Sequence, residues 1–152
     1  MLLNSSSIDY SGSEVKLGFQ IWKLSTIWQR KLNQQLKKDG LTHAQYAILE
    51  ALLWLTQDGE KITQINVARA VGIDPMMVSN LTRLLEKKGL VKRKSDKRDT
   101  RAKTLELTSQ GQYLITKIMP EVDKFDANFY STLKVNNRDL ADMANTLLTE
   151  NE

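Results

Sequence analysis

Several residue types that build common functional sites are absent or scarce in this chain of 152 residues. It has no cysteine, which excludes disulfides, thiolate catalysis and cysteine-ligated metal or redox sites. The single histidine, His43, excludes a histidine-cluster metal site and a two-histidine proton relay. Glycine-rich phosphate-binding motifs are also missing. We therefore expect no catalytic residues, no metal and no cofactor, and we do not expect an enzyme.

Long hydrophobic runs and chain-breaking residues are also scarce. The longest apolar runs, such as 51–55, are far shorter than the ~20 residues of a membrane span. The first residues, MLLNSSS, have neither a charged leader nor an apolar core, so no export signal is expected. With 2 Pro, 7 Gly and 41% hydrophobic residues, the composition is typical of a helix-rich globular protein. The expected location is the cytoplasm, without a membrane partner.

The positive charge is concentrated in one segment. Residues 83–103 hold ten basic and three acidic residues, a net of +7 in a chain whose net charge is +4. The remainder of the chain therefore carries −3. A solvated surface would spread this charge more evenly, so the pattern favours a polyanionic partner.

Capping residues predict where the helices begin. Thr42, Thr63 and Asp74 each precede a helical pattern, and Pro75 suits the first position of the third helix. Gly40, Gly72 and Gly89 are expected to end helices. We expect helices over about 13–38, 43–56, 64–70, 75–88, from 109 past Pro120, and about 137–149. Residues 90–94 and 102–107 are expected to form an antiparallel hairpin with a charged tip.

The helices expected at 64–70 and 75–88 have the features of a helix-turn-helix. Small Ala68 allows close approach of the two helices, and Val78, Leu81 and Leu85 would bury one face of the second. An ordinary helical hairpin is the alternative. The face opposite the buried one carries Met76, Met77, Ser79, Asn80 and Arg83. Such side chains suit base edges in a major groove, although either methionine would also be suited to covering the core.

The hairpin tip would provide a second contact with DNA. Lys97, Arg98 and Arg101 are placed to reach a minor groove, where the negative potential favours guanidinium groups. Asp96 and Asp99 would pair with neighbouring arginines and orient them. A solvated charged loop is the alternative interpretation.

Three sequence segments resemble the MarR family of winged helix-turn-helix transcription factors. They are residues 74–91, the motif DKRDTRA at 96–102 and the motif LELTSQG at 105–111. The resemblance extends over nearly the whole chain. It implies a mainly α (α+β) fold, in which a winged helix-turn-helix lobe with a two-stranded β-wing is flanked by N- and C-terminal dimerisation helices. It also implies a homodimer that reads a palindromic operator in double-stranded DNA, most often as a repressor.

The resemblance assigns residues to two DNA-contacting elements. The recognition helix would contribute Pro75, Met76, Met77, Ser79, Asn80 and Arg83, and the wing would contribute Lys94, Lys97, Arg98 and Arg101. Thr100 replaces a frequent second arginine, which would weaken wing contacts. The expected division is a flexible tail over 1–12, a dimerisation helix over 13–40, a DNA-binding lobe over 41–107 with its wing over 90–107, and dimerisation helices over 108–152.

Dimerisation is also expected from the residues themselves. The terminal helices carry wide apolar faces, which a lobe of this size cannot cover completely. Two-fold symmetry would then place two recognition helices about 34–36 Å apart, one turn of the duplex.

Many MarR-like proteins respond to small aromatic or phenolic effectors in a cleft between the dimer helices and the DNA-binding lobe. Here Trp22, Thr26, His43 and Tyr46 are candidates to line such a cleft. In the alternative interpretation, Trp22 and Tyr46 belong to the core and His43 is an exposed residue of a first helical turn. A winged-helix protein-interaction module without DNA binding is the alternative function, which the basic segment disfavours.

Overall fold

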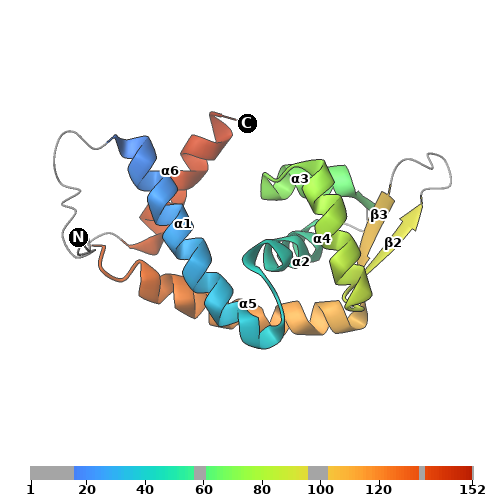
Figure 1. The fold of residues 1–152 in the computed structure, drawn as a ribbon. Coiled ribbons are helices and arrows are strands. Elements are labelled where there is room, and N and C mark those ends of the chain that lie inside the picture. The colour runs from blue at the N-terminus through green and yellow to red at the C-terminus, as the bar shows by residue number, and fades with distance from the viewer. Residues whose placement is uncertain (1–15, 57–60, 96–102, 134–135, 152) are drawn as a thin grey trace, which may run out of the picture.

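The computed structural model describes residues 16–56, 61–95, 103–133 and 136–151. Figure 1 shows an elongated molecule, in which different helices gather at each of its two ends. The first half of α1 (Leu17–Leu36) and α6 (Asn137–Thr149) lie at one end. At the other end, α2 (His43–Leu55), α3 (Gln64–Val71) and α4 (Pro75–Lys87) form a lobe with the sheet. The long helix α5 (Ser109–Phe129) runs from the lobe to the α1–α6 end, so one continuous helix connects them.

The helix starts predicted from capping residues are confirmed. The Thr42 hydroxyl accepts from the backbone N–H of Gln45, whose side chain accepts in return from the N–H of Thr42. Gly40 has φ 70°, the left-handed conformation expected of a helix-ending glycine. It follows a short 3-10 helix, η1 (Lys37–Asp39), that extends α1. Residues 13–15 of the expected first helix lie outside the described residues.

The sheet has one strand more than the hairpin predicted. The strands β2 (Val91–Ser95) and β3 (Lys103–Leu107) pair antiparallel, with Arg93 opposite Leu105. On its other side β3 pairs with β1 (Ile62–Thr63), giving the order β1-β3-β2. A strand of two residues leaves no alternation in the sequence, because Thr63 also caps α3. The strand β1 was therefore not predicted.

The core lies within the lobe, between α2, α3, α4, β3 and the first half of α5. Its largest fully buried side chains come from all of these elements, from β2 and from the second half of α1. They are Leu32, Leu36, Ile48, Leu49, Leu52, Val67, Val78, Leu85, Val91, Leu105, Ile115 and Ile118. The position of Leu32 and Leu36 shows that the end of α1 belongs to the lobe, whereas its beginning does not.

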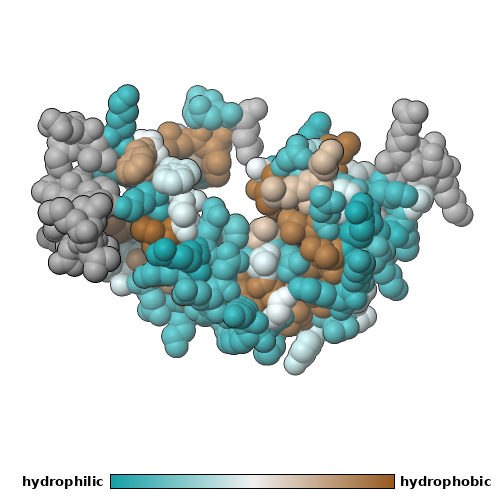
Figure 2. Space-filling view, viewed as in Figure 1, coloured by the Kyte–Doolittle hydropathy of each residue, from teal (hydrophilic) through white to brown (hydrophobic). Residues whose placement is uncertain are grey.

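The first half of α1 and the face of α6 expose hydrophobic side chains. Trp22 is 63% exposed and Leu17 is 69% exposed, and on α6 Met143 and Leu147 are 65% and 62% exposed. Figure 2 shows brown, hydrophobic residues on the surface at this end of the molecule. The interpretation of Trp22 as a core residue is therefore wrong for the single chain, since no described residue covers it enough to exclude solvent.

Candidate nucleic-acid interface

Side-chain caps begin α3 and α4, and a left-handed glycine ends α3 before the turn that joins them. The Thr63 hydroxyl accepts from the N–H of Asn66, and the Asn66 side chain accepts from the N–H of Thr63 at 2.8 Å. Gly72 ends α3 with φ 65°. Asp74 then begins α4, because its Oδ1 accepts from the N–H groups of Met76 at 2.8 Å and Met77 at 3.3 Å. These bonds satisfy amides that the first helical turn leaves without partners.

One face of α4 holds the helix in the lobe. Val78 and Leu85 are fully buried, and Leu81 packs against the same core, as the sequence indicates. Thr82 is also fully buried, and its hydroxyl donates to the Ser79 carbonyl and accepts from the Gln64 side chain at 3.3 Å. This polar link between α3 and α4 was not predicted, because a threonine among apolar residues leaves no distinct sequence signal.

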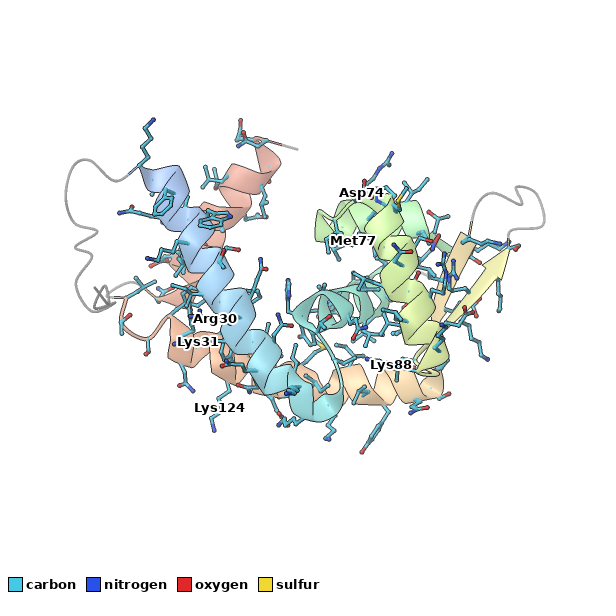
Figure 3. All side chains as sticks on the ribbon, in the orientation of Figure 1. Arg30, Lys31, Asp74, Met77, Lys88 and Lys124 are labelled. Atoms are coloured by element: carbon cyan, nitrogen blue, oxygen red, sulfur yellow. The ribbon has the colours of Figure 1, made fainter. Side chains whose placement is uncertain are left out.

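The opposite face of α4 is exposed, as predicted. Met76 and Met77 are 75% and 53% exposed, so the alternative that either methionine covers the core is wrong. Asn80 and Arg83 lie on the same exposed face, and Pro75 is exposed at the first turn. Ser79 differs from its prediction, because it is half-buried beside the α3–α4 contact. Figure 3 labels Asp74 and Met77 at the N-terminal end of α4, on the outside of the lobe.

The two strands of the hairpin are joined by a charge pair. The Lys94 ammonium lies 2.7 Å and 2.9 Å from the two carboxylate oxygens of Glu106 across the strand pair. The predicted wing residues Lys97, Arg98 and Arg101 lie outside the described residues, as do Asp96 and Asp99.

A contact from Arg93 to Glu86 joins the hairpin to α4. The backbone N–H of Arg93 donates to Glu86 Oε1 at 3.1 Å, and its guanidinium lies 3.7 Å from Glu86 Oε2. The Arg93 side chain is only 15% exposed. Arg93 was expected only as one of the basic residues of 83–103, because its pairing with Glu86 depends on how the hairpin folds back against α4. The contact ties the orientation of the hairpin to that of α4.

The four effector candidates differ in burial. Trp22 and Thr26 are exposed on α1, and the Thr26 hydroxyl donates to the Trp22 carbonyl at 2.9 Å. Tyr46 is 4% exposed, as the core interpretation expects, and its hydroxyl donates to Glu50 at 3.2 Å. His43 is half-buried rather than exposed, and its ring meets Trp28 edge-on with centroids 6.2 Å apart.

Burial changes the ionisation of this region. It lowers the pKa of His43 and raises the pKa of Glu50, whose hydrogen bond from Tyr46 acts in the opposite direction. Burial also raises the pKa of Asp126, although the Trp28 indole N–H donates to its carboxylate at 2.7 Å. The Trp28–Asp126 bond fastens α1 to α5 across 98 positions of sequence, so it had no local signal.

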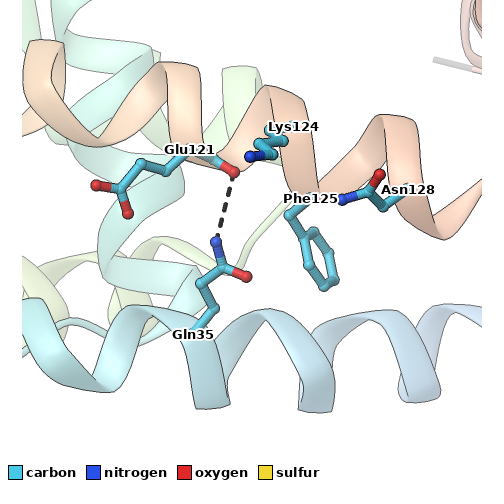
Figure 4. Close-up of a pocket in the computed structure, with 5 residues that line it drawn as sticks. All are labelled: Gln35, Glu121, Lys124, Phe125 and Asn128. Carbon is cyan, nitrogen blue, oxygen red and sulfur yellow. Dashed lines mark hydrogen bonds between the residues drawn. The ribbon is translucent and has the colours of Figure 1, made fainter.

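A pocket of about 350 Å³ lies between α1 and α5 (Figure 4). Its lining is Gln35, Glu121, Lys124, Phe125 and Asn128, so it contains none of the four predicted effector residues. The Gln35 side chain reaches toward the Glu121 carbonyl across it.

Neither a membrane span nor a metal cluster is found in the part of the chain that the structure describes. None of its helices is long and apolar enough to cross a bilayer. Among the same residues, no group of three or more His, Asp or Glu side chains is arranged to hold a metal ion.

The fold and the exposed face of α4 define the class of protein. A short helix, a glycine turn, a capped second helix and a β-hairpin make up a winged helix-turn-helix, so this chain has the architecture of a DNA-binding transcriptional regulator.

Comparisons with known proteins agree with this class. The family model described as "ArnR1-like, winged-helix domain" matches residues 34–137. The HTH-type transcriptional regulator YdcH of Bacillus subtilis is 35% identical, over 80% of this chain and 83% of YdcH. The structure of S. aureus MepR in complex with DNA is similar with a TM-score of 0.75 and 29% identity, covering 90% of this chain and 97% of MepR. A MarR-family regulator from Rhodococcus sp. RHA1 is similar with a TM-score of 0.72 and 25% identity, over 86% of this chain and 88% of that protein. The chain belongs to the MarR family of winged helix-turn-helix transcriptional regulators.

Proposed function

We propose that this protein is a homodimeric repressor that reads a palindromic operator with α4 in the major groove. The exposed face of α4 carries the proposal. Two methionines exposed by 75% and 53% are unfavourable on a surface that faces only water. Beside Asn80 and Arg83 they match base edges, since asparagine pairs with adenine, arginine with guanine, and apolar groups with thymine methyls. The similar S. aureus MepR was determined in complex with DNA, which supports the same partner here.

The wing over 95–101 is proposed to enter the minor groove. Lys94, Lys97, Arg98 and Arg101 would supply its cations, and Asp96 and Asp99 would orient the arginines. Within this set Lys94 already pairs with Glu106 in the free protein, so its contribution is expected to be the smallest. The Arg93–Glu86 contact supports the proposal, because it fixes the base of the wing against α4.

The dimer is proposed to form through α1, α5 and α6. Exposed apolar residues at the α1–α6 end would be covered by a second copy, which explains why Trp22 and Leu147 are exposed in one chain. The two recognition helices would then stand about 34–36 Å apart. Sedimentation of the full chain is expected to give twice its mass, and a monomer at micromolar concentration would contradict the proposed dimer.

The same proposal divides the chain into four parts. They are a tail over 1–12, a dimerisation helix over 13–40, a DNA-binding lobe over 41–107 and dimerisation helices over 108–152. A cytoplasmic location and a role that requires binding without catalysis are also part of this proposal.

A small aromatic or phenolic effector is proposed to control DNA binding. Its site would be lined by His43 and Tyr46 from the first turn of α2 and by Trp22 and Thr26 from the exposed face of α1. An aromatic ligand is supported by Phe125, whose ring lines the neighbouring pocket between α1 and α5 and packs against Trp28 with centroids 6.5 Å apart. Calorimetry with phenolic acids is expected to give heat and a change in DNA affinity. If millimolar ligand gives no heat and no change in DNA affinity, this part of the proposal is wrong.

Fluorescence anisotropy with random-sequence DNA at low salt separates a DNA reader from an interaction module. A dimer that neutralises about 6–10 phosphates is expected to lose a factor of ~10³–10⁵ in affinity between 50 and 200 mM salt. The variant Arg98→Ala/Arg101→Ala should weaken binding and reduce this salt dependence without changing the dimer. Arg30→Ala/Lys124→Ala is the control with equal charge loss, since Figure 3 places both residues away from the lobe. Because α1 and α5 are proposed to dimerise, sedimentation must show that this control is still a dimer. Equal effects of the two variants would remove the wing from the mechanism.

A further inference from the structure

Three consecutive residues just after α1 make polar contacts with α5 and with the end of α4. We call Lys38–Gly40 the α1 junction. The Lys38 ammonium donates to the Glu121 carboxylate on α5. Asp39 lies 3.7 Å from the Lys117 ammonium, one α5 turn earlier. The Gly40 carbonyl accepts from the ammonium of Lys88, at the end of α4. The α1 junction therefore joins the helix proposed to mediate dimerisation to the helix proposed to read DNA.

Lys88 also contacts the start of α2. Its ammonium donates to Gln45 Oε1 at 3.0 Å. Gln45 is 4% exposed, and the same Oε1 accepts from the N–H of Thr42 at 3.2 Å. The amide that receives Lys88 is thus held in place by the capping box of α2. A cation that faces the carbonyl at a helix end is favoured by the helix dipole, and both hydrogen bonds are charge-assisted.

On its other side, the end of α4 is fixed to α5. The Thr108 hydroxyl donates to the Gly89 carbonyl at 2.6 Å, and the Thr108 N–H donates to the Leu90 carbonyl at 3.1 Å. A Cβ at Gly111 would lie 2.0 Å from the Leu90 oxygen, so α5 and the end of α4 are in direct backbone contact. The C-terminal end of α4 is therefore held between α5 and the α1 junction. Lys88 supplies the side-chain hydrogen bonds on the junction side.

We propose that Lys88 is a positioning residue, which sets the angle of α4 relative to α1 and thereby the separation of the two recognition helices in the dimer. The inference rests on the proposed function. Helix α4 has 13 residues, so it is about 20 Å long, and a rotation of about 5° about its C-terminal end moves its N-terminal end by about 1.7 Å. A displacement of that size at Met76 is enough to misplace hydrogen bonds to base edges.

The test compares Lys88→Met with Lys87→Met. The control removes the same charge from the neighbouring exposed residue, which makes none of the contacts to the junction. The probes are the palindromic duplex that this protein selects from a random pool and the same duplex with one base pair added or removed between its half-sites. Lys88→Met should lose about three- to tenfold in affinity for the selected duplex, as expected for one or two partly exposed charge-assisted hydrogen bonds. The wild type should lose affinity when the spacing between the half-sites is altered. This loss should be smaller for Lys88→Met, whereas Lys87→Met should lose as much affinity as the wild type.

Other results of this comparison would contradict either the role of Lys88 or the proposed dimeric reader. If both variants keep the wild-type spacing penalty, Lys88 does not position α4. If each lowers the salt slope by about 1, both lysines contact phosphates and the positioning role is wrong. Wild-type protein without any spacing preference would contradict the proposed dimeric reader itself, and the role of Lys88 with it. A melting temperature of Lys88→Met close to that of Lys87→Met confirms that the comparison is made between folded proteins.

Discussion

Asp74 is expected to have two opposing effects, because it caps α4 and also brings negative charge to the proposed DNA-binding face. As a cap, it accepts from the N–H groups of Met76 and Met77. Replacing an N-cap aspartate by alanine typically costs about 1 kcal/mol, whereas asparagine caps about as well. In a chain of this length, 1 kcal/mol corresponds to about 2–4 °C in melting temperature. Asp74→Ala should therefore melt about 2–4 °C lower, and Asp74→Asn within about 2 °C of the wild type.

DNA binding should separate the two variants in the opposite way. An exposed charge interaction is worth about 0.2–1 kcal/mol, so removing the carboxylate in Asp74→Asn should raise affinity for DNA about 1.5- to fivefold. Asp74→Ala loses the same charge but also loosens the first turn of α4, which holds Met76 and Met77, so it should bind more weakly than Asp74→Asn. Calorimetric melting and fluorescence anisotropy at one salt concentration give both quantities. Identical melting of the two variants would refute the capping argument, and lower affinity of Asp74→Asn would refute the placement of Asp74 near phosphates.

Two further predictions concern stability. Gly111→Ala should destabilise the protein by about 2–3 kcal/mol or more, because the new Cβ would overlap the Leu90 carbonyl. Gly18→Ala is the matched helical control, since nothing lies within 4 Å of the added Cβ. Its melting temperature should equal that of the wild type or be higher. Similar losses of stability in both variants would contradict the close contact between Gly111 and Leu90. Glu50→Gln should raise the melting temperature at pH 8, because burial raises the pKa of Glu50 and its folded carboxylate is disfavoured. The raised folded pKa means that wild-type stability falls as pH rises through it, so the gain should vanish below the ordinary value of 4.5, and a gain independent of pH would contradict the argument.

The helices were predictable because their signals are local. Thr42, Thr63 and Asp74 cap helices at the positions that the sequence indicates, and the buried and exposed faces of α4 follow from helical spacing. The two-residue strand β1 was missed, since a pairing with β3 leaves no pattern in so short a segment. The burial of Ser79 was misjudged because it depends on how closely α3 approaches α4.

The contacts that orient the site were not predictable, since they join residues distant in sequence. The Arg93–Glu86 contact, the Trp28–Asp126 bond and the contacts of Lys88 all depend on packing between elements. Trp22 shows the reverse case. One interpretation placed it in the core, but helical periodicity cannot distinguish a face that packs within one chain from a face left for a second chain.

Selection of bound duplexes from a random pool by the full chain tests the central claim most directly. Two copies of α4, related by two-fold symmetry, should enrich an inverted repeat whose half-sites are centred about 10–10.5 base pairs apart. Asn80→Ala should alter the preference at one position of each half-site, by about 1–3 kcal/mol. A pool that stays random, or a motif without a repeat, would contradict a symmetric reader built on the exposed face of α4.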